Sequence, residues 1–77
     1  ALTISVFPQP ALEQLNIQSS TSVTGLALFD IQGRAVRFWD EQGANIQLSI
    51  HAIPAGAYVL KGSSVKGPWR KKILIVD

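Results

Sequence analysis

The sequence contains no cysteine and no methionine in its 77 residues. Without cysteine the chain can form neither a disulfide framework nor a thiolate metal site. The charge is nearly balanced, with seven Lys and Arg against five Asp and Glu, and this excess is too small to predict nucleic-acid binding. No apolar run approaches the roughly 20 residues of a membrane-spanning helix, and no signal peptide is visible. These absences leave one small domain, spanning residues 1–77, as the expected organisation.

Residue types that carry out catalysis are also scarce. The single histidine, His51, is interpreted as a solvated or structural loop residue. The carboxylates Asp30, Asp40 and Glu41 fall at predicted turns, where their ordinary role is to cap the backbone. No metal-ligand spacing and no phosphate-binding glycine run occurs. We therefore expect no catalytic residues, no metal site and no cofactor, and we expect that the protein is not an enzyme.

Apolar residues, 47% of the chain, alternate with polar ones in short runs, which predicts an all-β domain. Turn residues recur roughly every 8–12 positions, and no stretch has helical periodicity. This pattern is typical of an antiparallel β-sandwich, and an immunoglobulin-like arrangement of about seven strands is the expected fold class. The predicted strands are residues 2–7, 12–18, 23–30, 34–40, 44–50, 57–63 and 69–76.

The alternation also predicts which side chains face the core. The polar segment at residues 19–22 is predicted to be a loop, and Phe29 lies on the face away from the core, so we expect it to be partly covered or to mark a contact surface. The predicted core residues are Ile4, Leu15, Ile17, Leu26, Leu28, Val36, Leu48, Tyr58, Leu60 and Ile73.

Two tight turns connect the predicted strands. In the first, Asp30, Gly33 and Arg34 are expected to be structural: the aspartate caps the turn and the glycine supplies a left-handed residue. In the second, Pro54 presets φ and Gly56 accepts a positive φ before a strand begins. Gly33 and Gly56 are therefore the residues at which we expect a positive φ.

The basic cluster of the last strand and the two tryptophans leave alternatives open. The basic cluster Arg70-Lys71-Lys72 either protects an edge strand from aggregation or forms a docking surface for an acidic partner. Trp39 and Trp69 either pack in the interior or line a sugar-binding face. Because the strand beyond these cations is apolar on both faces, we expect it to be covered or paired, and we expect weak homodimers at high concentration.

Four stretches, taken together and in order, resemble the C-terminal sorting domains of the type IX secretion system (the Por secretion system) of Bacteroidota. The sequence departs mildly from the family pattern at Gln9, Phe29 and Ile53, where Asn, Tyr and Leu are usual. The four stretches are Val6-Phe7-Pro8-Gln9-Pro10 with Leu15-Asn16-Ile17, then Leu28 to Val36, then Ile53 to Leu60, and finally Lys71 to Val76.

The resemblance implies a non-enzymatic domain at the C-terminus of a longer exported protein, and the start of the chain without Met fits a piece of such a protein. Such domains direct their parent protein through the periplasm and the outer membrane to the cell surface or the medium. The implied partners are the type IX translocon and cell-surface sortase proteins, with anionic lipopolysaccharide joined to the parent protein in many members. The alternative is an immunoglobulin-like adhesion module that binds carbohydrate or protein.

The resemblance also suggests which residues the secretion machinery reads. We expect recognition of the second turn together with the end strand, through strand addition at an extended chain end. The two lysines of that strand would steer the encounter with an acidic groove. The predicted recognition residues are Pro54, Ala55, Gly56, Tyr58, Lys71, Lys72, Ile73, Leu74, Ile75 and Val76.

Overall fold

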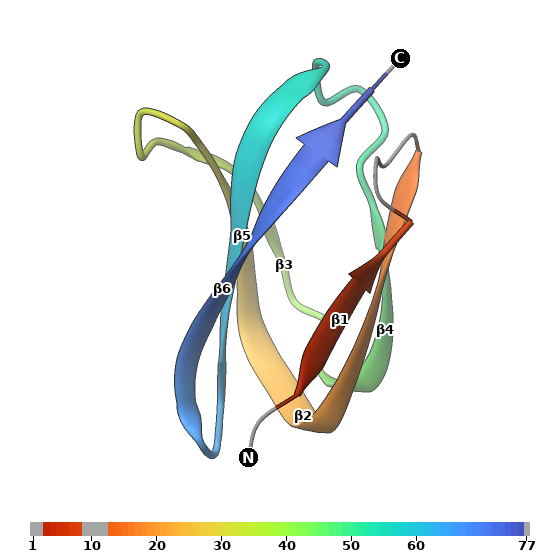
Figure 1. Ribbon diagram of the computed structural model, residues 1–77, viewed down its shortest axis with the longest axis vertical. Helices are drawn as coiled ribbons and strands as arrows, with labels where there is room; N and C mark the ends of the chain where they lie inside the picture. The colour runs from red at the N-terminus through yellow and green to blue at the C-terminus, as the bar shows by residue number, and fades with distance from the viewer. Residues whose placement is uncertain (1–2, 9–12, 77) are drawn as a thin grey trace.

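The computed structural model describes residues 3–8 and 13–76, and this part of the chain consists of six strands joined by turns, with no helix (Figure 1). Leu2, Gln9, Pro10 and Leu12, which belong to predicted strands or to the first motif, lie outside the described residues. The strands are β1 (Ile4–Phe7), β2 (Gln14–Asp30), β3 (Ala35–Trp39), β4 (Gly43–Ser49), β5 (Gly56–Ser64) and β6 (Gly67–Ile75).

Strand β2 has 17 residues and pairs with four of the other strands, always antiparallel. Its first half lies between β1 and β4, where Ile17 is opposite Val6 on one side and Ile46 on the other. Its second half lies between β3 and β5, where Leu28 is opposite Leu60. Strand β6 completes the arrangement by pairing with β5. The chain thus forms one antiparallel sheet that is organised around a single long strand.

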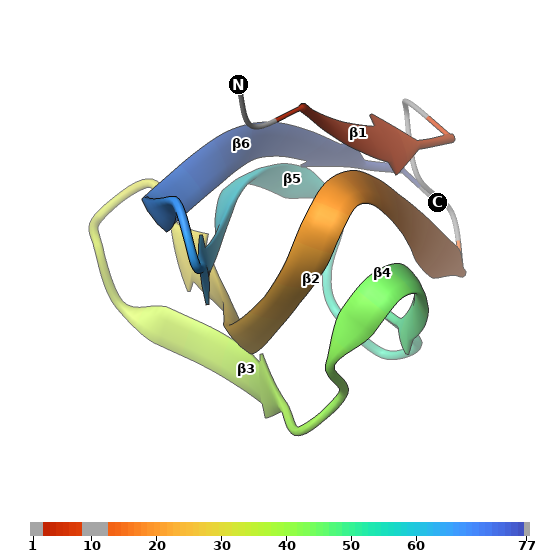
Figure 2. The same ribbon diagram turned by 90° about the horizontal axis from the view of Figure 1, so that it is seen from below.

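The middle of β2 bends and carries the strand from one layer to the next. The pairing with β4 shifts register between Gln18 and Val23, and the pairing with β5 shifts between Thr24 and Ala27. Gly25, at the second shift, has a φ of 64°, which glycine adopts without a steric penalty. Seen from below, the sheet curls around this bend so that its two halves face each other (Figure 2).

The polar segment at residues 19–22 is part of this continuous strand, so the prediction of a loop there is wrong and the strands number six, not seven. Its backbone pairs with the N-terminal strand: Ser19 is opposite Ile4, and the Ser20 N–H donates to the Thr3 carbonyl at 2.9 Å. Main-chain pairing makes this segment a strand. Its side chains are polar because they lie at an open bend.

The all-β class expected from the sequence is confirmed, and the antiparallel sheet curls into two layers that are consistent with the expected immunoglobulin-like sandwich. One layer contains β1, the first half of β2 and β4, and the other contains β3, the second half of β2, β5 and β6. Every predicted core residue except Val36 is buried, in one cluster that draws on both layers. The cluster also includes residues that were not predicted, namely Val23, Ile46, Ile50, Ile53 and Ile75.

Strand β3 turns the opposite face to the core from the one predicted. Val36 is 39% exposed and Phe38 is 72% exposed, while Trp39 packs against the core cluster. The reason is a register shift within the β2–β3 pairing, which sets Arg37 opposite Leu28 on the inward face. A shift of one residue exchanges the two faces of a strand, and the alternation alone does not reveal where such a bulge occurs.

We predict that Leu28→Ala lowers the free energy of unfolding by about 2–5 kcal/mol, because the side chain is fully buried between both neighbours of β2. The matched control is Phe38→Ala, a larger truncation at an exposed site, which should change stability by about 0.5 kcal/mol or less. Urea unfolding followed by tryptophan fluorescence measures both. Equal losses for the two variants would contradict the assignment of the faces.

Candidate functional site

The second predicted turn is closed by the only tyrosine of the chain. The Tyr58 hydroxyl donates a hydrogen bond of 2.6 Å to the carbonyl of Pro54, four residues upstream, and the tyrosine ring is buried. β-Sandwiches use such tyrosine corners to hold the chain where it turns into a strand. Gly56, the first residue of that strand, has a φ of 156°, and Gly33 has a φ of 87°, so both have the positive φ expected from the sequence.

Side chains of β3 hold the segment that leads into this corner. The Arg37 guanidinium donates to the carbonyls of Ser49 and His51, at 3.4 and 3.0 Å, and the Trp39 indole N–H donates to the same Ser49 carbonyl at 3.3 Å. This role of Arg37 was not predicted from the sequence. The usable signal was its alternation with Trp39, since both residues lie on one face of the strand.

The end strand lies directly beside the corner. In the β5–β6 register, Gly56 is opposite Ile75 and Tyr58 is opposite Ile73. The two isoleucines are each 2% exposed and belong to the core, whereas Leu74, between them in sequence, is 49% exposed on the other face. The predicted recognition residues from the two motifs are therefore brought together, but Ile73 and Ile75 are buried, and only Lys71, Lys72 and Leu74 of the predicted strand residues are exposed.

The chain beyond β6 also reaches the corner. Val76 and Pro54 line a hollow of about 480 Å³, together with Glu13, His51 and Ala52. Ala52 has a φ of 68°, an uncommon conformation for a residue with a Cβ. Beside the corner, then, the protein offers a shallow, mixed surface instead of an enclosed pocket.

The three cations of the end strand do not form one patch. Lys71 is opposite Leu60 and lies on the inward face at the margin of the layer. Lys72 is opposite Val59 on the outward face. Arg70 is also on the outward face, opposite Lys61. Strand β6 lies at the edge of the sheet, where it pairs with β5. An inward-pointing charge on an edge strand discourages edge-to-edge aggregation, so Lys71 has a different role from Arg70 and Lys72.

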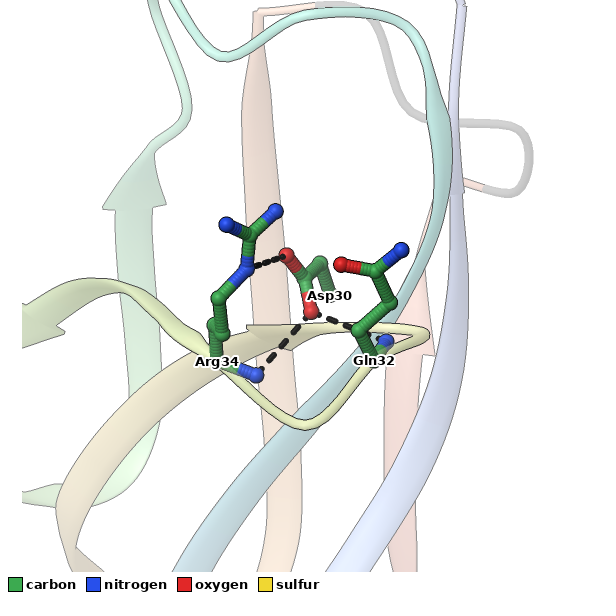
Figure 3. A network of polar contacts seen from close by, with 3 residues as sticks. All are labelled: Asp30, Gln32 and Arg34. Atoms are coloured by element: carbon green, nitrogen blue, oxygen red, sulfur yellow. Dashed lines mark hydrogen bonds and ion pairs between the residues drawn. The ribbon is translucent and has the colours of Figure 1, made fainter.

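The first predicted turn joins β2 to β3 and is held by one aspartate (Figure 3). The Asp30 carboxylate accepts hydrogen bonds from the N–H groups of Gln32 and Arg34, at 2.9 and 3.0 Å, and from the Arg34 guanidinium at 3.2 Å. The backbone N–H of Arg34 is the main reason that the pKa of Asp30 lies below its ordinary value of 3.8. The Gly33 N–H completes the turn by donating to the Asp30 carbonyl.

Both tryptophans are half-buried against the core cluster, and this favours packing over a sugar-binding face. Trp69 covers Gly62 on the adjacent strand so closely that a Cβ there would lie 2.6 Å from the ring. Glycine in a strand leaves a gap, and an aromatic side chain on the neighbouring strand fills it.

Within residues 3–8 and 13–76 no three histidine or carboxylate side chains gather closely enough to bind a metal ion. Over the same residues no helix has the length and apolar character needed to span a bilayer.

A comparison with protein families gives a match over nearly the whole chain. The model of the secretion system C-terminal sorting domain matches residues 5–76. Searches of curated proteins and of solved structures give no significant match. The matched region includes all six strands except the first residue of β1, and it contains both turns and the end strand.

We predict that Tyr58→Phe lowers the free energy of unfolding by about 1–2 kcal/mol, because the Pro54 carbonyl loses its donor while the ring is retained. Chemical denaturation of the two proteins measures the difference. An unchanged stability would mean that the hydroxyl bond does not hold the corner.

The stability provided by Asp30 should depend on pH. Because its pKa is lower in the folded protein, its contribution is fully present above about pH 3.8, the ordinary value, and is lost as the pH falls through the folded pKa. Asp30→Asn should therefore be less stable than the parent at pH 6, and the gap in melting temperature should close in acid. A gap that is constant from pH 6 to pH 2 would refute this linkage.

Proposed function

The chain belongs to the family of C-terminal sorting domains of the type IX secretion system, and we propose that it directs a parent protein across the outer membrane to the cell surface. Membership of this family identifies the domain as a sorting signal and implies export to the surface or the extracellular space. The route through the periplasm and the presence of a longer parent protein belong to the proposal. Domains of this family act as signals and not as catalysts, and we propose no enzymatic step for this one.

The main support for this proposal is one row of cross-strand pairs. Asp30 of the first turn is opposite Tyr58 of the corner, and Tyr58 is opposite Ile73 of the end strand. Three motifs that are far apart in sequence thus meet on three adjacent strands. A receptor that accepts many different parent proteins has to read the domain itself. Tyr58 and Ile73 are buried, so the composite surface offered to it consists of exposed residues beside this row, such as Ala55 and Leu74.

We propose that the machinery contacts the corner, Pro54-Ala55-Gly56 with Tyr58 behind it, and the end strand from Lys71 to Val76. The support is their adjacency across β5 and β6 and the exposure of Lys71, Lys72 and Leu74. Strand addition as the mode of contact stays a prediction, as does weak homodimer formation. The further partners that we propose are the translocon and a surface sortase, with lipopolysaccharide joined only to the parent protein.

The proposal predicts that residues 1–77, fused to the end of a periplasmic reporter, deliver the reporter to the surface of a cell with a working type IX system. Protease accessibility of the reporter on intact cells measures delivery. The controls are the reporter without the domain and the fusion in a strain without the translocon. Retention of the fusion in the periplasm of the competent strain would contradict the proposal.

Two variants of this fusion address the end strand. Deletion of residues 72–77 should abolish delivery, but it also removes the buried Ile73 and Ile75. The reversal Lys71→Glu with Lys72→Glu keeps these core residues and should reduce delivery with little change in melting temperature, since exposed charges contribute little to stability. Full delivery by the truncated form would show that the end strand is not part of the signal. A large fall in melting temperature in the charge-reversed form would show that the lysines stabilise the fold and do not serve recognition.

A further inference from the structure

The outward side of the second layer combines cations with apolar side chains. Cross-strand pairs place Ala27, Lys61 and Arg70 in one row and Phe29, Val59 and Lys72 in the next. Phe38 of β3 extends the first row, because it is opposite Ala27. We call this surface the outer face. It consists of Phe29, Phe38, Val59, Lys61, Arg70, Lys72 and Leu74, with Ala27 buried among them.

Two cations of the outer face stand directly opposite each other. Lys61 and Arg70 are paired across β5 and β6, and like charges in that position destabilise a sheet. No carboxylate among the described residues forms a salt bridge with either of them. The Lys61 ammonium instead lies 4.6 Å from the centre of the Phe29 ring, and a cation–π contact offsets part of the repulsion.

Apolar side chains lie at both ends of the outer face. At one end, Phe38 is largely exposed and lines, with Phe29 and Lys61, a hollow of about 530 Å³. At the other end, Leu74 lines a hollow of about 430 Å³ with the exposed Ile31. Exposed apolar groups of this kind, next to charge of one sign, are typical of a protein interaction site.

We propose that the outer face docks a protein of the sorting machinery whose own surface presents carboxylates between projecting apolar side chains. This inference rests on the proposed function and names the surface and the chemistry of the partner. Carboxylates would relieve the repulsion between Lys61 and Arg70, which is the charge complementarity that selects an acidic partner.

The shape of the outer face favours a protein partner over a lipid surface or a second copy of this chain. Two separate hollows at opposite ends accept individual side chains, whereas binding to a lipid surface uses one apolar face that inserts into the interface. A second copy that bound through the same face would bring Lys61 and Arg70 towards the same residues of its partner, because a two-fold interface is self-complementary. Either of those outcomes is distinguishable by experiment.

The test uses Arg70→Glu in the reporter fusion, with Lys66→Glu as the matched control. Lys66 is an exposed cation in the hairpin between β5 and β6, outside the outer face. We expect Arg70→Glu to reduce surface delivery about tenfold, because loss of charge complementarity slows association. We expect Lys66→Glu to remain within about twofold of the parent, as a solvated charge away from an interface has little effect.

Stability separates recognition from folding in this test. Arg70→Glu converts a like-charge pair into an opposite-charge pair, so its melting temperature should rise while its delivery falls. If Arg70→Glu is poorly folded, Arg70→Gln provides the same test, because it also removes the repulsion. A lower melting temperature in both variants, with delivery falling in parallel, would assign Arg70 to the fold and overturn the proposal.

Apolar contact is tested by Phe38→Ser, which should reduce delivery to a similar extent at an unchanged melting temperature, since Phe38 is exposed. If the parent fusion is delivered and both Arg70→Glu and Phe38→Ser are delivered equally well, the outer face is not the docking surface, although the sorting function stands. If the parent fusion itself is not delivered, the proposed function fails first.

Two measurements on the purified domain exclude the other occupants. In sedimentation with phosphatidylglycerol vesicles, we expect no binding that depends on Arg70. If the parent domain binds the vesicles and Arg70→Glu does not, the outer face docks a lipid surface and not a protein. Analytical ultracentrifugation should show no dimer that Arg70→Glu disrupts, and such a dimer would replace it with a second copy.

Discussion

The pairing of β2 with four neighbours is the constraint on which the rest of the structure depends. Each layer has half of this strand as a member, so the registers of both layers are set by the same 17 residues. The bend near Gly25 determines how the two layers face each other, and it therefore determines which side chains enter the common core. A change at the bend would act on both layers at once, whereas a change in β6 would act directly on its pairing with β5 alone.

The sequence predicted the fold class, and all predicted core residues but Val36 are buried, because a buried face imposes strict alternation. Leu15 and Ile17, or Leu26 and Leu28, follow that rule wherever one side of a strand is packed. Two predictions were wrong for the same physical reason. The continuity of β2 through residues 19–22 and the inward face of β3 are decided by pairing with distant strands, and local composition does not contain the register.

The candidate site was only partly predictable. Its individual motifs are visible in the sequence, because a tight turn needs specific residues such as Asp30 and Gly33. Their meeting is not visible, since the row from Asp30 to Tyr58 to Ile73 exists only when β2 and β6 flank β5 in one register. The support that Arg37 gives to the segment before the corner was missed because its partners, the carbonyls of Ser49 and His51, are backbone atoms that carry no sequence signature.

The end strand divides its residues between the core and the surface that we propose for recognition. Ile73 and Ile75 face the core, while Lys72 and Leu74 face outward, so each purpose uses every second residue. A truncation removes both sets together, and its effect on export has no unique interpretation. The outward residues of β5 and β6 can change without altering the packed face. A folded signal of this size has little interior to spare. For this reason the residues that a receptor reads without disturbing the fold must lie on the outward sides of its strands and at its corners.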